Sequence, residues 1–356
     1  MKRCLVILSL MVIAMAANVA VAQFTQEHSK PAKTKKQRVE PSFAWSVSEP
    51  LGLHYPSTID TIHLDYHRTM VPSMVSDAWL TTGNYGAPGQ DQIFFNRPVT
   101  SEFFFEDAIG AWMHNTGTMR YYNTRIPMTL LSHSTGGDKY SNLDRTQMEF
   151  SGNVDRKTQV GGGIDYIYSK GSYDMQADKD FTWRLFGSHM GDRYEVQTFF
   201  NHYNYTTKES GGITDDRFIT DPAEVQGGET RVDNKSIPTL LSSAHNHLEG
   251  SQLYLNQRYK VGFYRYRRDS ITDTVIDRTY VPVTSFIWTL DFKHSKHQFI
   301  NTSGSENATF FDHTYLGLGG TDENTRYWRL RNTVGVSMLE GFNKYAKFGF
   351  SVYGTH

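Results

Sequence analysis

From about residue 146 to the C-terminus, apolar and polar residues alternate along the chain with a period of two. In residues 147–155, Met148 and Phe150 alternate with Glu149 and Ser151. Because successive side chains of a strand point to opposite faces, this pattern predicts strands with one apolar and one polar face. The segments that carry it are 147–155, 159–169, 181–188, 253–263, 286–293, 328–338 and 347–352. The sequence therefore predicts an antiparallel all-β fold.

Two architectures produce such alternation: a soluble sandwich with its apolar face inward, and a membrane barrel with its apolar face toward lipid. Most of these segments have the nine to eleven residues that a membrane strand needs, rather than the five or six typical of soluble strands. The connections between them alternate short turns with longer polar loops, mainly 171–180, 206–250 and 295–326, as in outer-membrane barrels. We therefore expect an antiparallel transmembrane β-barrel, complete or incomplete, with about ten recognisable strands.

The alternation assigns side chains to faces. Expected lipid-facing or girdle residues are Phe150, Tyr166, Trp183, Leu255, Phe286, Trp288, Trp328 and Phe350. Expected pore-lining residues are Glu149, Asp165, Arg184, Glu195, Arg258, Lys260, Asp291, Lys293, Arg329, Arg331 and Lys347. These comprise seven cations and four anions, a balance of 7 − 4 = +3 that favours a mild anion preference. The alternative is that these charges pair across neighbouring strands. In residues 194–205, Phe199, Tyr203 and Tyr205 share the polar face.

The N-terminal third lacks this pattern. Residues 1–22 read as a cleavable secretory signal, with Lys2 and Arg3, an apolar stretch, and a small-residue site at Ala20-Val21-Ala22. Residues 23–40 are a polar, basic leader. Residues 41–100 are expected to form an irregular, plug-like region against or inside the mouth of a barrel spanning 101–356. Segments 102–113 and 118–134 are its expected first strands, although Pro127 interrupts the second.

Composition narrows the function classes. The net charge of −1 lacks the basic excess of a nucleic-acid-binding protein. The one cysteine, Cys4, lies within the expected signal, so no disulfide framework can form. Beyond the signal, no apolar run approaches the length of a transmembrane helix. The chain has 49 aromatic residues (22 Phe, 21 Tyr and 6 Trp), yet its mean hydropathy is only −0.52. This combination fits a barrel with a polar interior and polar loops.

Several ordered motifs give a resemblance. The segments are Gly83-Asn84-Tyr85-Gly86-Ala87-Pro88-Gly89-Gln90, Phe94-Phe95-Asn96-Arg97-Pro98, Tyr122-Asn123-Thr124-Arg125-Ile126-Pro127, Gly171-Ser172-Tyr173 and Gly211-Gly212-Ile213-Thr214-Asp215-Asp216. Over residues 45–356 the chain resembles the putative β-barrel porins of Bacteroidetes-type outer membranes. The resemblance implies an outer-membrane location and a pore.

No motif predicts catalysis or a bound cofactor. The pairs His245/His247 and His294/His297 lack the companion ligands of a metal site. The loop at 317–320 lacks the Lys-Ser/Thr of a phosphate loop. The acidic loop around Asp215 lacks the spacing of an EF-hand. We therefore expect no enzymatic activity, no metal and no cofactor.

The expected function is a porin-like channel for passive diffusion of small polar solutes. Its expected partners are outer-membrane lipid and those solutes, with no nucleic acid; the oligomeric state is left open. One alternative is a barrel that anchors long loops, above all 206–250, for a surface partner. A second is a secreted soluble β-sandwich that binds or processes glycans.

Overall fold

The computed structural model describes residues 42–59, 76, 78–97, 101–124, 126–138, 141–268, 275–312, 319–338 and 349–356. The expected signal and leader, and Lys347, lie outside the described residues. No described helix is long and apolar enough to cross a bilayer.

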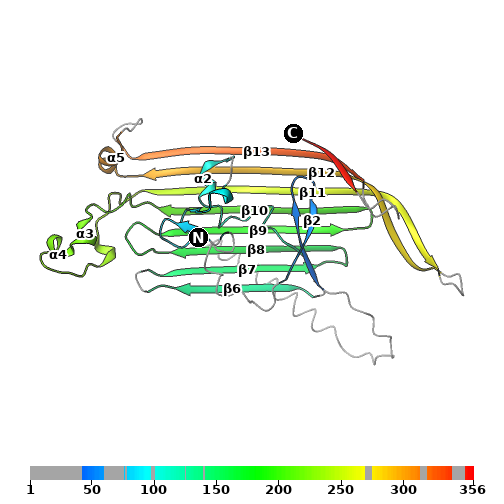
Figure 1. Cartoon of the computed structure of the whole chain (residues 1–356), viewed down its shortest axis with the longest axis horizontal. Coiled ribbons are helices and arrows are strands. Elements are labelled where there is room, and N and C mark those ends of the chain that lie inside the picture. The colour runs from blue at the N-terminus through cyan, green and yellow to red at the C-terminus, as the bar shows by residue number, and fades with distance from the viewer. Residues whose placement is uncertain are drawn as a thin grey trace, which may run out of the picture. The chain divides into compact units, whose positions relative to one another are not determined.

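The dominant element is a nine-stranded sheet in which every neighbouring pair is antiparallel (Figure 1). Its strands follow chain order: β6 (Met128–Gly136), β7 (Leu143–Asn153), β8 (Thr158–Ser169), β9 (Asp178–Met190), β10 (Tyr194–Lys208), β11 (His245–Arg268), β12 (Val275–Asn301), β13 (Thr321–Met338) and β14 (Phe350–Thr355). The structure confirms the antiparallel all-β architecture. The described strands form an open sheet with β6 and β14 at its edges.

The direction of the two edge strands constrains how this sheet can close. Eight successive antiparallel pairings separate β6 from β14, so the two edge strands run in the same direction. Direct pairing of β6 with β14 would therefore be parallel. An all-antiparallel ring built on these strands needs an odd number of further strands between the two edges.

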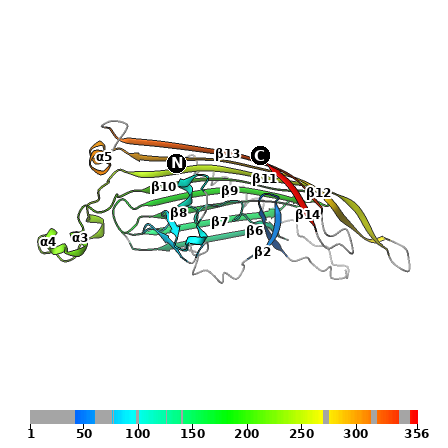
Figure 2. The same ribbon diagram turned by 45° about the horizontal axis from the view of Figure 1, so that its top comes forward.

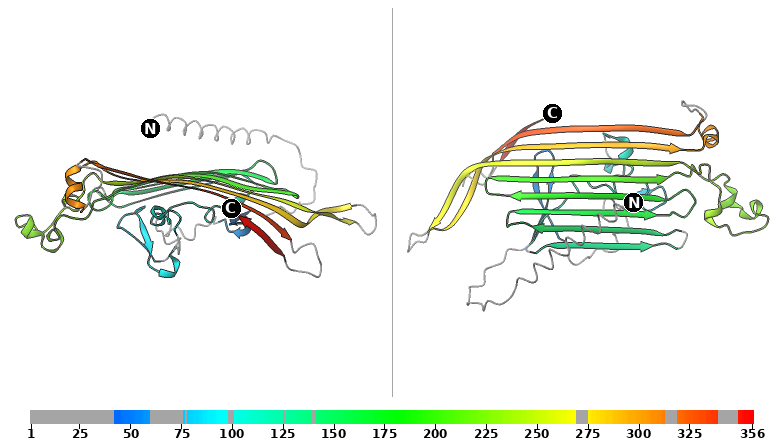
Figure 3. Two further views of the ribbon diagram at one scale, coloured as in Figure 1. Left: turned by 90° about the horizontal axis from the view of Figure 1, so that it is seen from above. Right: turned by 180° about the vertical axis from the view of Figure 1, so that it is seen from behind.

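The residues before the sheet form a separate layer, here called the N-terminal layer and comprising the described residues between 42 and 124. Its elements are β1 (Phe43–Ser48), β2 (Leu53–Ser57), β3 (Trp79–Thr81), β4 (Gly89–Asp91), η3 (Phe94–Asn96), α2 (Phe104–Asp107) and β5 (Tyr121–Asn123). The layer lies on one side of the long sheet, as the edge-on view in Figure 3 shows. We call that side of the sheet the covered face and the other the open face.

The expected first strands differ from the structure. Within 102–113, residues 104–107 form the helical turn α2, because the Phe103-Phe104-Phe105 run does not alternate. Phe103 is buried, whereas Phe104 is exposed. Within 118–134, β5 pairs with β1 in a small separate sheet, and the long sheet begins only at Met128, after Pro127.

The main core lies between the N-terminal layer and the covered face. Trp45 of β1 stacks on Tyr121 of β5 with ring centroids 5.9 Å apart, and Tyr121 meets Phe186 of β9 edge-on. Phe199 and Tyr254 complete this cluster from β10 and β11. These aromatic contacts bury the layer against the sheet.

This core explains why three aromatic residues share the polar face of β10. Phe199, Tyr203 and Tyr205 are each at most 2% exposed, because the N-terminal layer covers them. Phe199 belongs to the core beneath β1 and β5, and the two tyrosines pack with Phe103 and Trp112 of the layer. Their place on the polar face therefore reflects packing against the layer.

The strands run further than the hydrophobic signal indicates. β11 has 24 residues and β12 has 27, and their shared end extends past the neighbouring strands (Figure 2). The expected loop 206–250 shrinks to 209–244, and the loop 171–180 ends earlier because β9 begins at Asp178. The expected loop 295–326 is strand up to Asn301 and again from Thr321. The loop 209–244 carries α3 (Arg217–Thr220), α4 (Pro222–Val225) and η4 (Asn234–Ser236), and 302–320 carries α5 (Gly304–Phe310).

Glycines on the covered face make room for long side chains of neighbouring strands. Gly163 of β8 stands between Glu149 and Arg184 in the strand register, and these two residues pair across it. Gly250 of β11 stands in the same way between Tyr203 and Ser295, whose hydroxyls lie 2.9 Å apart. The missing side chains allow contacts across three strands.

We predict that Gly250→Ala lowers the free energy of unfolding in detergent by about 1 to 3 kcal/mol. An added Cβ would overlap the Tyr203 hydroxyl and lie 2.6 Å from the His294 carbonyl oxygen. Gly152→Ala is the control, because the nearest atom to its added Cβ would be 3.5 Å away. Urea unfolding followed by circular dichroism measures both, and equal stability of the two variants would contradict the packing argument.

Candidate functional site

The strand register places the eight expected lipid-facing residues together on the open face. Trp328 is 68% exposed, and Phe286 and Phe350 are also exposed. Phe150, Tyr166, Trp183 and Leu255 are partly buried by their neighbours. The open face is therefore rich in exposed aromatic and aliphatic side chains.

The same register brings ten of the eleven expected pore-lining residues together on the covered face. Lys347 lies outside the described residues. Sequence reasoning missed further charged residues of this face, among them Arg145, Asp178 and Asp180. Arg145 precedes the first recognised alternation, and the two aspartates fall in a stretch that reads as loop. The count of +3 was therefore incomplete.

Charges on one half of this face pair within the sheet. Arg184 pairs with Glu149, Arg145 with Asp165 at 2.7 Å, and Lys260 with Glu195. The Arg258 guanidinium donates to the Leu51 carbonyl oxygen of the N-terminal layer at 3.2 Å. Pairing between strands of the sheet, the alternative reading of the sequence, accounts for these three ion pairs, whereas Arg258 contacts the layer.

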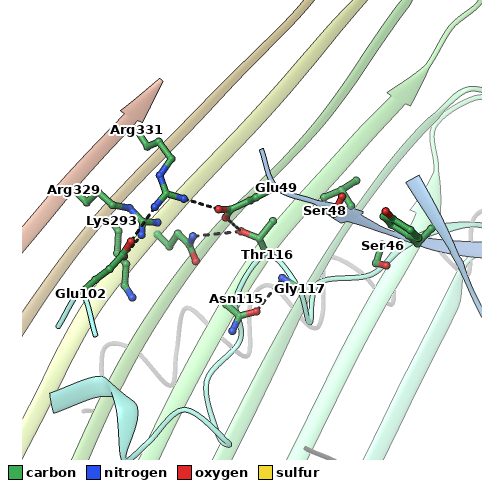
Figure 4. A pocket seen from close by; sticks show the side chains of 13 residues that line it. Ser46, Ser48, Glu49, Glu102, Asn115, Thr116, Gly117, Lys293, Arg329 and Arg331 are labelled. Carbon is green, nitrogen blue, oxygen red and sulfur yellow. Dashed lines mark hydrogen bonds and ion pairs between the residues drawn. The ribbon is translucent and has the colours of Figure 1, made fainter. Parts of the chain in front are cut away.

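On the other half, cations of the sheet meet glutamates of the N-terminal layer. Lys293 of β12 and Arg329 and Arg331 of β13 share their part of the face with one sheet carboxylate, Asp291, which pairs with Arg329. The layer supplies three carboxylates to these cations: Glu49, Glu102 and Glu106. Figure 4 shows most of this group around one pocket.

Glu106, in α2, is the most buried of the three layer glutamates, with a residue exposure of 7%. It pairs with Lys293 and accepts hydrogen bonds from the Tyr203 and Ser295 hydroxyls, both at 2.5 Å. Leaving one partner of such a buried pair uncompensated is strongly destabilising. The Glu106 cluster therefore fixes α2 to β10 and β12.

Arg331 joins the layer to the sheet at a more accessible place. It donates to Glu49 at 2.7 Å and to Glu102 at 2.9 Å, and Glu102 also pairs with Arg329. The side chains of Arg331, Glu49 and Glu102 are 31%, 30% and 42% exposed. Because solvent screens such pairs, each contributes little to stability and can exchange partners.

A second junction ties the layer to β8 and β9. The side-chain amide nitrogen of Asn84 donates to the backbone carbonyl oxygen of Gln176 at 2.5 Å and to the Asp178 carboxylate at 2.6 Å. Gly86 adopts a φ of +85°, and a Cβ there would lie 2.8 Å from a carboxylate oxygen of Asp180. The motif at 83–90 is therefore a docking turn, which needs glycine for both conformation and space.

Two layer side chains approach the charged residues of β7 and β8. The Tyr85 hydroxyl accepts from Arg145 at 3.2 Å, and His114 lies 3.5 Å from Asp165. Burial lowers the pKa of the His114 imidazole. The imidazole is therefore neutral at neutral pH, and it adds no second cation beside Arg145.

A pocket remains between the layer and β11–β13, with a volume of about 550 Å³. Its lining includes the charged residues Arg331, Arg329, Glu49, Glu102 and Lys293, together with amide, hydroxyl and apolar groups. A smaller pocket of about 270 Å³ lies beside α2. Among the described residues, no three His, Cys, Asp or Glu side chains are grouped to hold a metal ion. The larger pocket is thus charged. The partly exposed residues Arg331, Glu49 and Glu102 in its lining can exchange ion-pair partners.

Comparison with known proteins adds a family. The family model described as Putative porin matches residues 43–356, which covers the N-terminal layer and the whole sheet. The search of curated proteins finds no match.

We predict that Glu106→Gln lowers the free energy of unfolding by about 3 kcal/mol, because it leaves Lys293 buried without its counter-charge. It should also increase tryptic cleavage after Arg120, at the end of the layer. Asp192→Asn is the control, since Asp192 forms an exposed pair with Lys157 at 2.9 Å in the turns between strands. If cleavage after Arg120 is the same in both variants, Glu106 does not hold the layer in place.

Proposed function

The chain belongs to the putative porin family, and from this we propose that its long sheet forms the wall of an outer-membrane channel through which small polar solutes diffuse passively. The observation that carries the proposal is the division of the sheet into two faces. The open face exposes aromatic and aliphatic side chains, and the covered face gathers the charged ones.

This division fits a membrane wall. Lipid contacts on the open face need no polar partner, whereas charged side chains avoid lipid by facing the interior. The strands of 11 to 18 residues between β7 and β10, and in β13, are long enough to cross a hydrocarbon core with residues to spare. The export signal at residues 1–22 would direct the chain to that membrane.

In this proposal the N-terminal layer is a plug. It covers the face that would line the pore, and its three glutamates neutralise sheet cations. The route for solutes then runs between the plug and the wall, where the 550 Å³ pocket lies. Permeation makes and breaks no covalent bond and needs no cofactor.

We expect the purified protein to give single-channel currents in a planar bilayer. Glu49→Gln/Glu102→Gln should raise the conductance, because it releases Arg331 from the plug. Asp192→Asn, in an exposed turn, should leave the conductance unchanged. A folded protein that never conducts would contradict the channel and favour the anchor for loop-bound partners. Recovery of the chain in the soluble periplasm would favour the secreted alternative.

We also propose that the solute route between plug and wall has a mild preference for anions, because Lys293, Arg329 and Arg331 border it. The reversal potential in a potassium chloride gradient measures this preference. The Glu49→Gln/Glu102→Gln variant should shift it further toward anions, because the cations keep their charge while two carboxylates become neutral. A shift toward cations, or none, would refute the assignment of these residues to the solute route.

A further inference from the structure

The two kinds of ion pair between the plug and the wall differ in accessibility. The Glu106 and Lys293 side chains are 9% and 17% exposed. Within the wall itself, Asp291 is 2% exposed where it pairs with Arg329. Arg331 and its partners Glu49 and Glu102 are instead about one third exposed. The buried pairs can hold the structure while the exposed ones exchange. Arg331 is therefore the cation at which a solute can compete.

The chemistry of that competition follows from the present partners of Arg331. Its two terminal nitrogens each donate to a carboxylate oxygen, one of Glu49 and one of Glu102. A guanidinium matches a carboxylate with two parallel hydrogen bonds, which is stronger and more specific than two single contacts. While Glu49 stays on one terminal nitrogen, a solute carboxylate can replace Glu102 on the other and add a parallel hydrogen bond from the adjacent Nε.

The other groups of the pocket indicate what surrounds that carboxylate. Asn115, Thr116 and Gln252 present amide and hydroxyl groups, and Ser46, Ser48 and Tyr55 add three more hydroxyls. In Figure 4 the two serines lie on the far side of the pocket from Arg331. Hydroxyl groups of a solute suit such a lining, because they both donate and accept hydrogen bonds.

The volume sets an upper limit on the solute. About 550 Å³ is within the range of small-molecule sites. It accommodates a solute of six carbons with some water, but not a folded polypeptide. The pocket therefore fits a small hydroxylated acid.

We propose that this pocket is a binding site for small hydroxylated carboxylic acids, whose carboxylate binds Arg331 in place of Glu102. Glu49, the second carboxylate on Arg331, stays in place because the Thr116 hydroxyl donates a hydrogen bond to it at 2.9 Å. Glu102, in the bend before α2, has the more exposed side chain and is the partner that leaves. Binding then removes one of the plug's contacts with β13. The inference deepens the proposed function and rests on it for the passage of the acid.

The test measures binding on the full-length protein in detergent, without a membrane. Isothermal titration with gluconate should give saturable binding, and sorbitol, its uncharged counterpart, should bind at least tenfold more weakly. Arg331→Gln should weaken gluconate binding at least tenfold, and Arg331→Lys should restore only part of it. Arg217→Gln, which breaks an exposed pair in the loop 209–244, is the control and should bind as the wild type does.

The decisive variant is Glu102→Gln. It removes the competing carboxylate from Arg331, so gluconate should bind several-fold more tightly; a merely structural role for Glu102 predicts weaker binding. The proposal is overturned if wild type does not bind gluconate, if sorbitol binds equally, or if Glu102→Gln binds no more tightly. Displacement of gluconate by equimolar phosphate would overturn the carboxylate assignment in favour of a general oxyanion site.

The outcome is independent of the channel test. Gluconate binding without bilayer current would refute the proposed channel and leave the site intact. Current without gluconate binding would refute the site alone.

Discussion

The requirement that buried charges have partners organises this molecule. A sheet with a charged face cannot be covered by an apolar layer, because each uncompensated cation beneath it would be costly. The N-terminal layer meets the requirement with Glu49, Glu102 and Glu106, placed opposite Lys293, Arg329 and Arg331. Around these pairs, aromatic residues of both layers form the core that holds them in register.

The same constraint separates fixed from exchangeable contacts. Glu106 is buried and has three partners from β10 and β12. These contacts hold it firmly against the sheet. Arg331 lies at the edge of a pocket, where solvent weakens its two pairs. The N-terminal layer can stay attached along β8 to β12 while its contact with β13 changes.

Much of the sheet was predictable, because a strand with one apolar and one polar surrounding must alternate apolar and polar side chains. Phe150 and Glu149, or Trp328 and Arg329, could be assigned to opposite faces from parity alone, and in the structure each pair lies on opposite faces of the sheet. Strand ends were not predictable in this way. Residues 245–250 and 295–301 are strand, yet most of their side chains are polar and they show no regular alternation of apolar and polar residues. Asp178 and Asp180 were missed for that reason.

By itself, the sequence determined the fold class, the two faces of the sheet and the family, because these depend on local periodicity and on motifs contiguous in the chain. Only the tertiary structure decided what covers the charged face. Glu102 and Arg331 are 229 residues apart, and neither has a local pattern that names the other. The long sheet brings them together, so that charges which the sequence assigns to a pore lining form contacts with the N-terminal layer. Among the described strands, the place of β6 and β14 at the edges is likewise a property of the pairing, which the local sequence pattern does not contain.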